Sequence, residues 1–133
     1  VQRNKKPFSL IMFDLDHFKN VNDRFGHAAG DTVLRSVANT VKKRIRKTDY
    51  FARWGGEKFI ILLPETSLNN AVDLAEELRK QISTMELQGI GDVTASFGVT
   101  EYRDTDTIDT VLIRVDNMLY EAKGEGRNCV KSE

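Results

Sequence analysis

The sequence is poor in the features that mark several large classes of protein. It has one cysteine, Cys129, which excludes an internal disulfide framework and is consistent with a reducing compartment. No apolar run approaches the roughly 18 residues that a membrane-spanning helix needs. Its 20 lysines and arginines balance 20 aspartates and glutamates, so no overall field draws the chain to nucleic acid or to an anionic membrane. We therefore expect a cytoplasmic protein that binds no nucleic acid and whose anion sites are local.

The 133 residues suffice for one compact domain. There is no repeat, low-complexity stretch or linker, so we expect a single domain over 1–133. The opening VQRNKKPFSL resembles neither a signal peptide nor a natural start of translation. We therefore expect a domain excised from a longer regulatory protein, with an N-terminal sensory or regulatory domain, and any membrane anchor, outside this segment.

Hydrophobic patterning predicts an alternation of strands and helices. Apolar runs indicate strands, apolar residues at steps of three or four indicate amphipathic helices, and Gly55-Gly56 suits a tight hairpin. The expected strands are 8–16, 50–54, 58–63, 93–102 and a short one at 128–130; the expected helices are 29–47, one capped by Ser67 that runs to 82, and 108–123. The order strand-helix-helix-strand-strand-helix-strand-helix predicts an α+β fold, a mixed central β-sheet flanked by helices, as in ferredoxin-like and polymerase-palm domains.

Each of these helices has one apolar face that we expect to lie in the core. The faces are Leu34, Val37, Val41 and Ile45 in the first helix, Ala71, Leu74, Ala75, Leu78 and Ile82 in the second, and Ile108, Val111, Leu112, Val115, Leu119 and Ala122 in the last.

Acidic residues fall at two turns of the predicted sheet. Asp14 and Asp16 close the first strand two residues apart, so both carboxylates can face one side, and Mg²⁺ binds such oxygens. Glu57 follows Gly55 and Gly56, which let a ligand approach the backbone. The alternatives are solvated acids at a strand end and an ordinary glycine turn. Together, Asp14 and Glu57 can share one or two metal ions, as two-metal phosphoryl or nucleotidyl transfer requires.

Polar residues after the first strand can bind a nucleotide. In NVNDRFGHAAGD, the amide of Asn22 and the carboxylate of Asp31 can complement the edge of guanine. Alternatively, Asn22 is a turn residue and Asp31 caps the next helix. Lys19, Lys123 and Arg127 can hold phosphates, although the last two also suit a helix C-terminus as cations.

A further candidate is the segment Arg46-Lys47-Thr48-Asp49. Its arginine can bind phosphate or stack on a base, and its aspartate can accept from a guanine edge. The alternative is a solvated helix end.

Five segments resemble, in order and spacing, the successive motifs of the GGDEF domain, the diguanylate cyclase family: FDLDHFKNVNDRFGHAAGD, RKTD, RWGGEKF, ASFGV and LYEAKGEGRN. The resemblance runs from about residue 8 to residue 130 and implies the nucleotide-cyclase architecture. It also implies that two GTP-loaded domains meet as a homodimer. The 3′-hydroxyl of each GTP then attacks the α-phosphate of the other, giving cyclic di-GMP and two pyrophosphates.

Matched position by position, the resemblance implies a metal and substrate site. Asp14 binds both of two Mg²⁺ ions, for which Mn²⁺ is a substitute, with help from the Leu15 carbonyl. Glu57 is the second metal carboxylate and a candidate to activate the 3′-hydroxyl. The implied GTP contacts are the guanine-reading Asn22 and Asp31, the nearby His27, the phosphate-binding Lys19, Lys123 and Arg127, the backbone amides of His17 and Phe18, and the glycines Gly55 and Gly56.

The resemblance also assigns an inhibitory site. Arg46 and Asp49 match its RxxD motif, which lies five residues before the glycine pair. Cyclic di-GMP bound there would restrain the paired domains and stop synthesis, a coupling between two distinct sites.

One position departs from the family pattern, because Lys58 stands where the family usually has an acid. Strand alternation should send Glu57 and Lys58 to opposite faces, so we expect the lysine to stay out of the metal site while removing a negative charge near it. Two hypotheses follow: an active, product-inhibited cyclase, or a degenerate GGDEF domain that binds GTP or cyclic di-GMP as a sensor or interaction module. A related nucleotide cyclase or polymerase palm is disfavoured by the position of RKTD.

Overall fold

The computed structural model describes residues 6–133, so the first five residues of the expected domain lie outside the described residues. A five-stranded mixed sheet has the order β2-β3-β1-β4-β5, in which only β4 and β5 run parallel. The predicted α+β architecture is therefore confirmed. The elements are β1 (Phe8–Leu15), α1 (Phe18–Phe25), α2 (His27–Arg44), β2 (Tyr50–Gly55), β3 (Lys58–Pro64), α3 (Leu68–Ser83), β4 (Ala95–Glu101), α4 (Ile108–Gly124) and β5 (Val130–Ser132).

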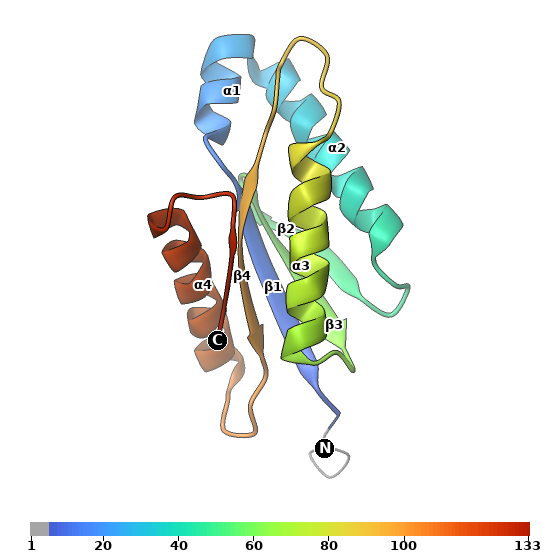
Figure 1. The fold of residues 1–133 in the computed structure, drawn as a ribbon, viewed down its shortest axis with the longest axis vertical. Coiled ribbons are helices and arrows are strands. Elements are labelled where there is room, and N and C mark those ends of the chain that lie inside the picture. Colours follow the sequence, from blue (N-terminus) through green and yellow to red (C-terminus); the bar gives the residue numbers. More distant parts are fainter. Residues whose placement is uncertain (1–5) are drawn as a thin grey trace.

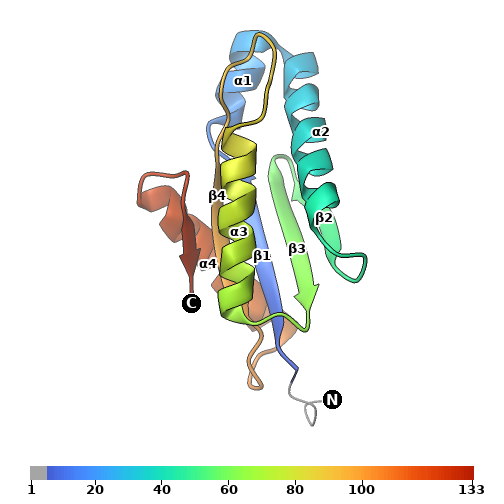
Figure 2. The same cartoon turned by 45° about the vertical axis from the view of Figure 1, so that its right-hand side comes forward.

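Helices cover both faces of the sheet (Figure 1). α2 and α3 lie on one face, α4 lies on the other, and α1 sits beyond the end of the sheet, as Figure 2 shows from a second direction. Ile11 and Phe13 of β1 belong to the core under α2 and α3, whereas Leu10 and Met12 belong to the core under α4. This two-sided burial explains why β1 reads as a continuous apolar run.

Stacked aromatic rings fill the centre of the larger core. Phe13 of β1 stacks on Phe59 of β3 and on Phe97 of β4, with ring centroids 4.9 Å apart in both pairs. Phe51 of β2 extends the stack, 5.6 Å from Phe59. Because β1 is the middle strand and is fixed on both sides, the position of its carboxyl end is well determined.

The predicted core faces are largely confirmed. All five residues expected from α3 are buried, and Ser67 caps that helix by accepting from the Asn70 N–H. The prediction was wrong for Ile108, whose side chain is 73% exposed, because α4 joins the core only from Val111 onward. Leu34, Val37 and Val41 are buried as expected, whereas Ile45 is partly buried at the end of α2.

α4 lies very close to β4. A Cβ atom on Gly98 would lie 2.6 Å from the Val115 carbonyl oxygen and 2.4 Å from the Leu119 backbone nitrogen. Glycine at this position therefore permits the contact between strand and helix. Within residues 6–133, no helix is long and apolar enough to cross a membrane.

Candidate active site

The carboxyl end of β1 meets the tip of the β2–β3 hairpin. The Leu15 N–H donates to the Glu57 carbonyl oxygen at 3.3 Å, and Gly56 has a φ of 51°, in the left-handed region that favours glycine. Through this backbone contact, the end of β1 that carries Asp14 adjoins the turn that carries Glu57. The predicted hairpin at Gly55-Gly56 is confirmed.

Asp14 is buried, with 6% of its side chain exposed. Its Oδ2 atom forms an ion pair with Lys123 of α4, whereas Oδ1 has no hydrogen-bond partner among the described residues. A buried carboxylate oxygen without a partner is costly, and a divalent cation would satisfy it. The donor set therefore fits the metal role that we expect for Asp14, although no group of three or more His, Cys, Asp or Glu side chains with metal-binding geometry occurs in residues 6–133.

Asp16 lies on the same side of the sheet as Asp14, as expected, but has different partners. Just beyond the end of β1, the Asp16 carboxylate reaches Ser96, which is paired with Asp14 in the β1–β4 register and therefore faces the same side. It accepts from the hydroxyls of Thr94 and Ser96, both at 2.7 Å, and from the Asn128 N–H at 3.0 Å. Asp16 therefore ties the end of β1 to β4 and to the segment after α4.

A pocket of about 520 Å³ opens between α1, α2 and the hairpin tip. It brings together seven of the residues that the sequence analysis assigned to the nucleotide or the metal. Two further residues line it: Leu34, which we expected only in the core, and Arg53, which carried no predicted role. The lining is Phe18, Lys19, Asn22, His27, Asp31, Leu34, Arg53, Gly56 and Glu57.

The two residues proposed to read guanine face this pocket from different helices. Asn22 belongs to α1 and Asp31 to α2, and the two helices meet at Gly26, which caps α2. Asn22 is therefore not a turn residue and Asp31 is not a helix cap, so both alternatives were wrong. An amide and a carboxylate on one wall of a pocket have the donors and acceptors that a guanine edge requires.

Gly30 positions Asn22, and the sequence analysis did not single it out. A Cβ atom at Gly30 would lie 1.9 Å from the Asn22 Oδ1 atom, so the amide lies directly against the α2 backbone. The signal was present in the sequence, because an isolated glycine inside a helical pattern commonly has a packing reason.

The expected phosphate ligands are only partly gathered in this pocket. Lys19 lines it, whereas Lys123 reaches Asp14 from α4. Arg127 is exposed beyond the end of α4 with a φ of 65°. Arg53 lines both this pocket and a second pocket of about 350 Å³, to which Arg35 and Lys42 of α2 also contribute.

The RxxD residues form a compact turn between α2 and β2. Asp49 accepts from the Arg46 backbone N–H at 2.9 Å and from Arg46 Nη2 at 2.8 Å, and the side-chain hydrogen bond raises the pKa of the guanidinium. Arg46 also donates to the Pro64 carbonyl oxygen and the Thr66 hydroxyl, yet half of its side chain remains exposed. The six residues of β2 separate this turn from the hairpin tip by about 20 Å, so it is a separate location.

Lys58 and Glu57 lie on opposite faces, as strand alternation predicts. Glu57 lines the nucleotide pocket, and Lys58 reaches Asp116 of α4 with 3.3 Å between Nζ and Oδ1. The register nevertheless pairs Lys58 with Asp14, and directly opposite residues point to the same face. Lys58 therefore shares a face of the sheet with Asp14 and not with Glu57, while its ammonium contacts Asp116.

Comparison with known proteins establishes the family. The family model described as "Diguanylate cyclase, GGDEF domain" matches residues 1–129, so the chain belongs to the GGDEF-domain family. It is 43% identical over 125 residues to the diguanylate cyclase DgcM of Escherichia coli K12, covering 94% of this chain and 30% of that protein. The chain thus spans about a third of the length of the curated relatives.

Solved structures agree with this assignment. The chain resembles the active GGEEF domain of a diguanylate cyclase from Vibrio cholerae with a TM-score of 0.93 and 34% identity, covering 98% of this chain and 85% of that one. It also resembles the GGDEF domain of DgcB from Caulobacter crescentus in complex with c-di-GMP, with a TM-score of 0.93 and 31% identity, covering 98% and 78%.

Proposed function

We propose that this domain is a diguanylate cyclase that condenses two GTP molecules into cyclic di-GMP and two pyrophosphates as a homodimer. One observation carries the proposal: Asn22, Asp31, Gly56 and Glu57 line one pocket, and the Glu57 backbone is hydrogen-bonded to Leu15, which follows the buried Asp14. This arrangement supports guanine recognition beside two carboxylates that could bind metal. The named activities of the relatives support the same reaction.

Different residues of the pocket bind different parts of the GTP molecule. Asn22 and Asp31 hold the guanine, with the Asp31 carboxylate accepting from N1–H and the exocyclic amine, which adenine cannot offer together. His27 lies beside them, and Gly56 lets the sugar and phosphates approach the hairpin. The backbone amides of His17 and Phe18, with Lys19, face the triphosphate.

Asp14, Glu57 and the Leu15 carbonyl would hold two Mg²⁺ ions, or Mn²⁺ in their place. When bound, such ions neutralise the triphosphate and favour ionisation of the attacking hydroxyl. Glu57 accepts the proton of the 3′-hydroxyl as the new bond from O3′ to the α-phosphorus forms and the bond to pyrophosphate breaks. Lys123, which pairs with Asp14 Oδ2, and Arg127 are the cations that would hold the phosphates.

A homodimer is required by the reaction itself. One domain holds one GTP, and each new bond joins the O3′ atom of one nucleotide to the α-phosphate of the other. Two domains must therefore face each other across their pockets. We also propose that an N-terminal sensory or regulatory domain controls this pairing in the cytoplasm; the curated relatives are about three times as long as the part that matches this chain.

Arg46 and Asp49 are proposed to bind the product. The guanidinium is held in place by Asp49, Pro64 and Thr66 while half of its side chain faces solvent. A preorganised arginine loses little freedom when it binds a phosphate or a base. Cyclic di-GMP bound at this turn would restrain the paired domains and inhibit synthesis.

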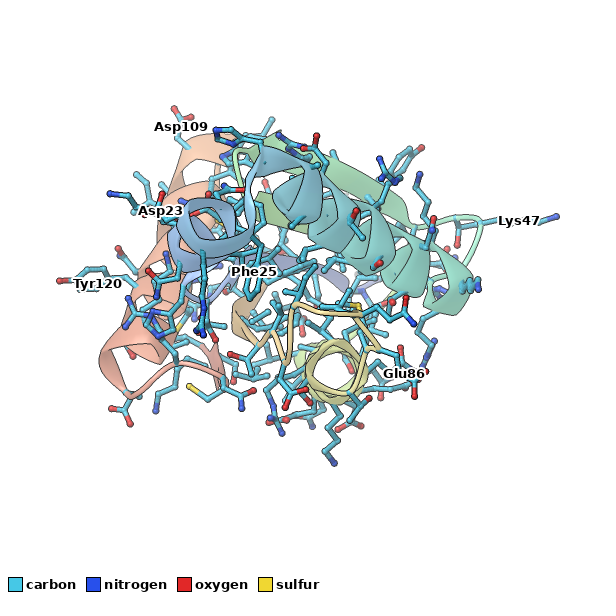
Figure 3. All side chains as sticks on the ribbon, turned by 90° about the horizontal axis from the view of Figure 1, so that it is seen from above. Asp23, Phe25, Lys47, Glu86, Asp109 and Tyr120 are labelled. Atoms are coloured by element: carbon cyan, nitrogen blue, oxygen red, sulfur yellow. The ribbon has the colours of Figure 1, made fainter. Side chains whose placement is uncertain are left out.

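The test uses the domain fused to a dimerising coiled coil, incubated with GTP and Mg²⁺, with cyclic di-GMP measured by mass spectrometry. Synthesis is expected, and Glu57→Gln should abolish it while circular dichroism shows an intact fold. Glu86→Gln, in the exposed segment before β4 (Figure 3), is the matched control and should keep the activity. ATP in place of GTP should give no product.

A specific observation favours a second function, because Lys58 lies opposite Asp14. If GTP or cyclic di-GMP binds to the dimerised domain and no product forms, the domain is a degenerate GGDEF module that acts as a sensor or interaction partner. Retained synthesis by Glu57→Gln would instead reject the role assigned to Glu57.

A further inference from the structure

α4 presents two charged side chains to the site end of the sheet. Asp116 pairs with Lys58 of β3, and Lys123 pairs with Asp14 of β1. Asp116 and Lys123 are seven residues apart, about two helical turns, and therefore lie on the same face of α4. These four residues, here called the quartet, are charge-balanced, and each lysine contacts one carboxylate.

The quartet leaves one carboxylate oxygen of Asp14 unused. Oδ1 is buried and has no hydrogen-bond partner in the part of the chain that the structure describes. Lys58 stands directly opposite Asp14 across the β1–β3 ladder, where Cβ atoms are about 5 Å apart. A lysine side chain is long and flexible enough to span that separation. Lys58 therefore has two carboxylates within reach and contacts Asp116.

We propose that Asp116 is a positioning residue that holds the Lys58 ammonium on α4 and thereby keeps Asp14 Oδ1 available to a divalent cation. The inference rests on the proposed function, which assigns Asp14 to the metal. An ammonium on Oδ1 would occupy the lone pairs that a cation needs and would repel that cation. The ion pair between Asp116 and Lys58 also explains how this chain, with a lysine at position 58 where the family usually has an acid, retains a free oxygen on Asp14.

The direct test measures metal binding rather than synthesis. Mn²⁺ alone is titrated into the ¹⁵N-labelled domain while the broadening of the Leu15 and Glu57 amide signals is followed by NMR. Asp116→Asn keeps the shape of the side chain and removes its charge, so Lys58 moves to Asp14. We expect Mn²⁺ binding at these amides to weaken about tenfold, equivalent to about 1.4 kcal/mol.

Two further variants separate this role from a structural one. Lys58→Met keeps an unbranched side chain, one atom shorter and without the charge, and in the Asp116→Asn background it should restore Mn²⁺ binding at least to the original level. Asp109→Asn makes the same change in net charge in the first turn of α4 (Figure 3) and should leave binding unchanged. A crystal structure of the Asp116→Asn variant should show the Lys58 ammonium against Asp14.

Three results would overturn the proposal: equal Mn²⁺ binding in Asp116→Asn, a loss that Lys58→Met does not rescue, or no Mn²⁺ broadening at these amides in the unmodified domain. Cyclic di-GMP synthesis is scored separately. Weakened Mn²⁺ binding in Asp116→Asn, in a domain that makes no product, supports the positioning role and rejects the cyclase. Synthesis of cyclic di-GMP together with unchanged Mn²⁺ binding in Asp116→Asn supports the cyclase and rejects the positioning role.

Discussion

Asn22 of α1 lies so close to Gly30 of α2 that a Cβ atom on Gly30 would be 1.9 Å from the amide oxygen. The same imaginary atom would lie 3.2 Å from the Phe18 ring. One missing methyl group therefore lets two helices hold the amide that we assign to guanine recognition. The specificity of the pocket thus depends on a residue that itself offers no functional group.

Gly30→Ala should weaken GTP binding about tenfold, because the displaced amide loses a hydrogen bond to the base. The fold should survive, since Asn22 can swing away and alanine is a better helix former than glycine. Calorimetric titration with a non-hydrolysable GTP analogue measures the affinity. Adding Asn22→Ala to this variant should cause no further loss, and unchanged affinity in Gly30→Ala would remove the assignment of Asn22 to guanine.

Lys58→Glu should make the stability of the domain depend on Mg²⁺. The change removes the ion pair with Asp116 and places a like charge opposite Asp14, so the metal-free domain should lose about 1 kcal/mol of unfolding free energy. Millimolar Mg²⁺ should recover the loss because it binds the folded state. Urea denaturation with and without Mg²⁺ measures both values. Lys58→Met, which adds no negative charge, should lose less stability without metal and should gain less from Mg²⁺ than Lys58→Glu does; an equal gain in both variants would contradict the account.

Much of this architecture follows from local patterns, whereas the errors lie in long-range geometry. The buried face of α3 and the cap at Ser67 depend on residues three or four apart and were predictable. The pairing of Lys58 with Asp14 depends on the β1–β3 register, and a shift of one residue would send Lys58 to the other face. Likewise, the sequence does not reveal that Asp16 accepts hydrogen bonds from Thr94, Ser96 and Asn128.

In the candidate site, too, the residues that belong to local motifs were predictable, and those brought in by long-range packing were not. Motif spacing predicted Asn22, Asp31 and Glu57, and the pocket contains all three. Asp116 carried no recognisable signal, because an acid on the exposed side of an amphipathic helix is common. Its importance emerges only when packing brings α4 over the end of β3.

Arg46→Ala should relieve product inhibition, raising the cyclic di-GMP concentration needed for half-inhibition at least about tenfold, the effect of losing roughly one charged hydrogen-bonding group. It should also lower stability by about 1 kcal/mol, since Asp49, Pro64 and Thr66 lose a shared donor. Rates measured against added product give the inhibition curve. Lys47→Ala is the control, because Lys47 extends into solvent from the same turn (Figure 3) and should leave inhibition intact. An unshifted curve in Arg46→Ala would place the product elsewhere.

The stability of the domain should depend on pH through Asp106. Asp106 and Arg114 form a largely buried ion pair, 2.6 Å between Oδ2 and Nη2, and the hydrogen bond from the guanidinium holds the pKa of Asp106 well below its usual range, although burial acts in the opposite direction. The folded state therefore binds this proton less readily than the unfolded chain. The resulting stability is complete above the ordinary carboxyl pKa of about 4 and is lost as the pH falls toward the depressed value.

Asp106→Asn should accordingly cost about 3 kcal/mol at pH 7, because Arg114 is left buried without its counter-charge. The difference in unfolding free energy between the variant and the unmodified domain should shrink between about pH 4 and pH 2. In this range Asp106 takes up a proton in the unfolded chain of the unmodified domain, and the variant has no carboxylate at this position. Urea denaturation across this range measures the difference. Asp73→Asn, on the exposed side of α3, should differ by less than about 0.5 kcal/mol at every pH. A pH-independent cost for Asp106→Asn would mean that the carboxyl group is not held ionised by Arg114, and the link between α4 and the end of β4 would then rest on hydrogen bonding alone.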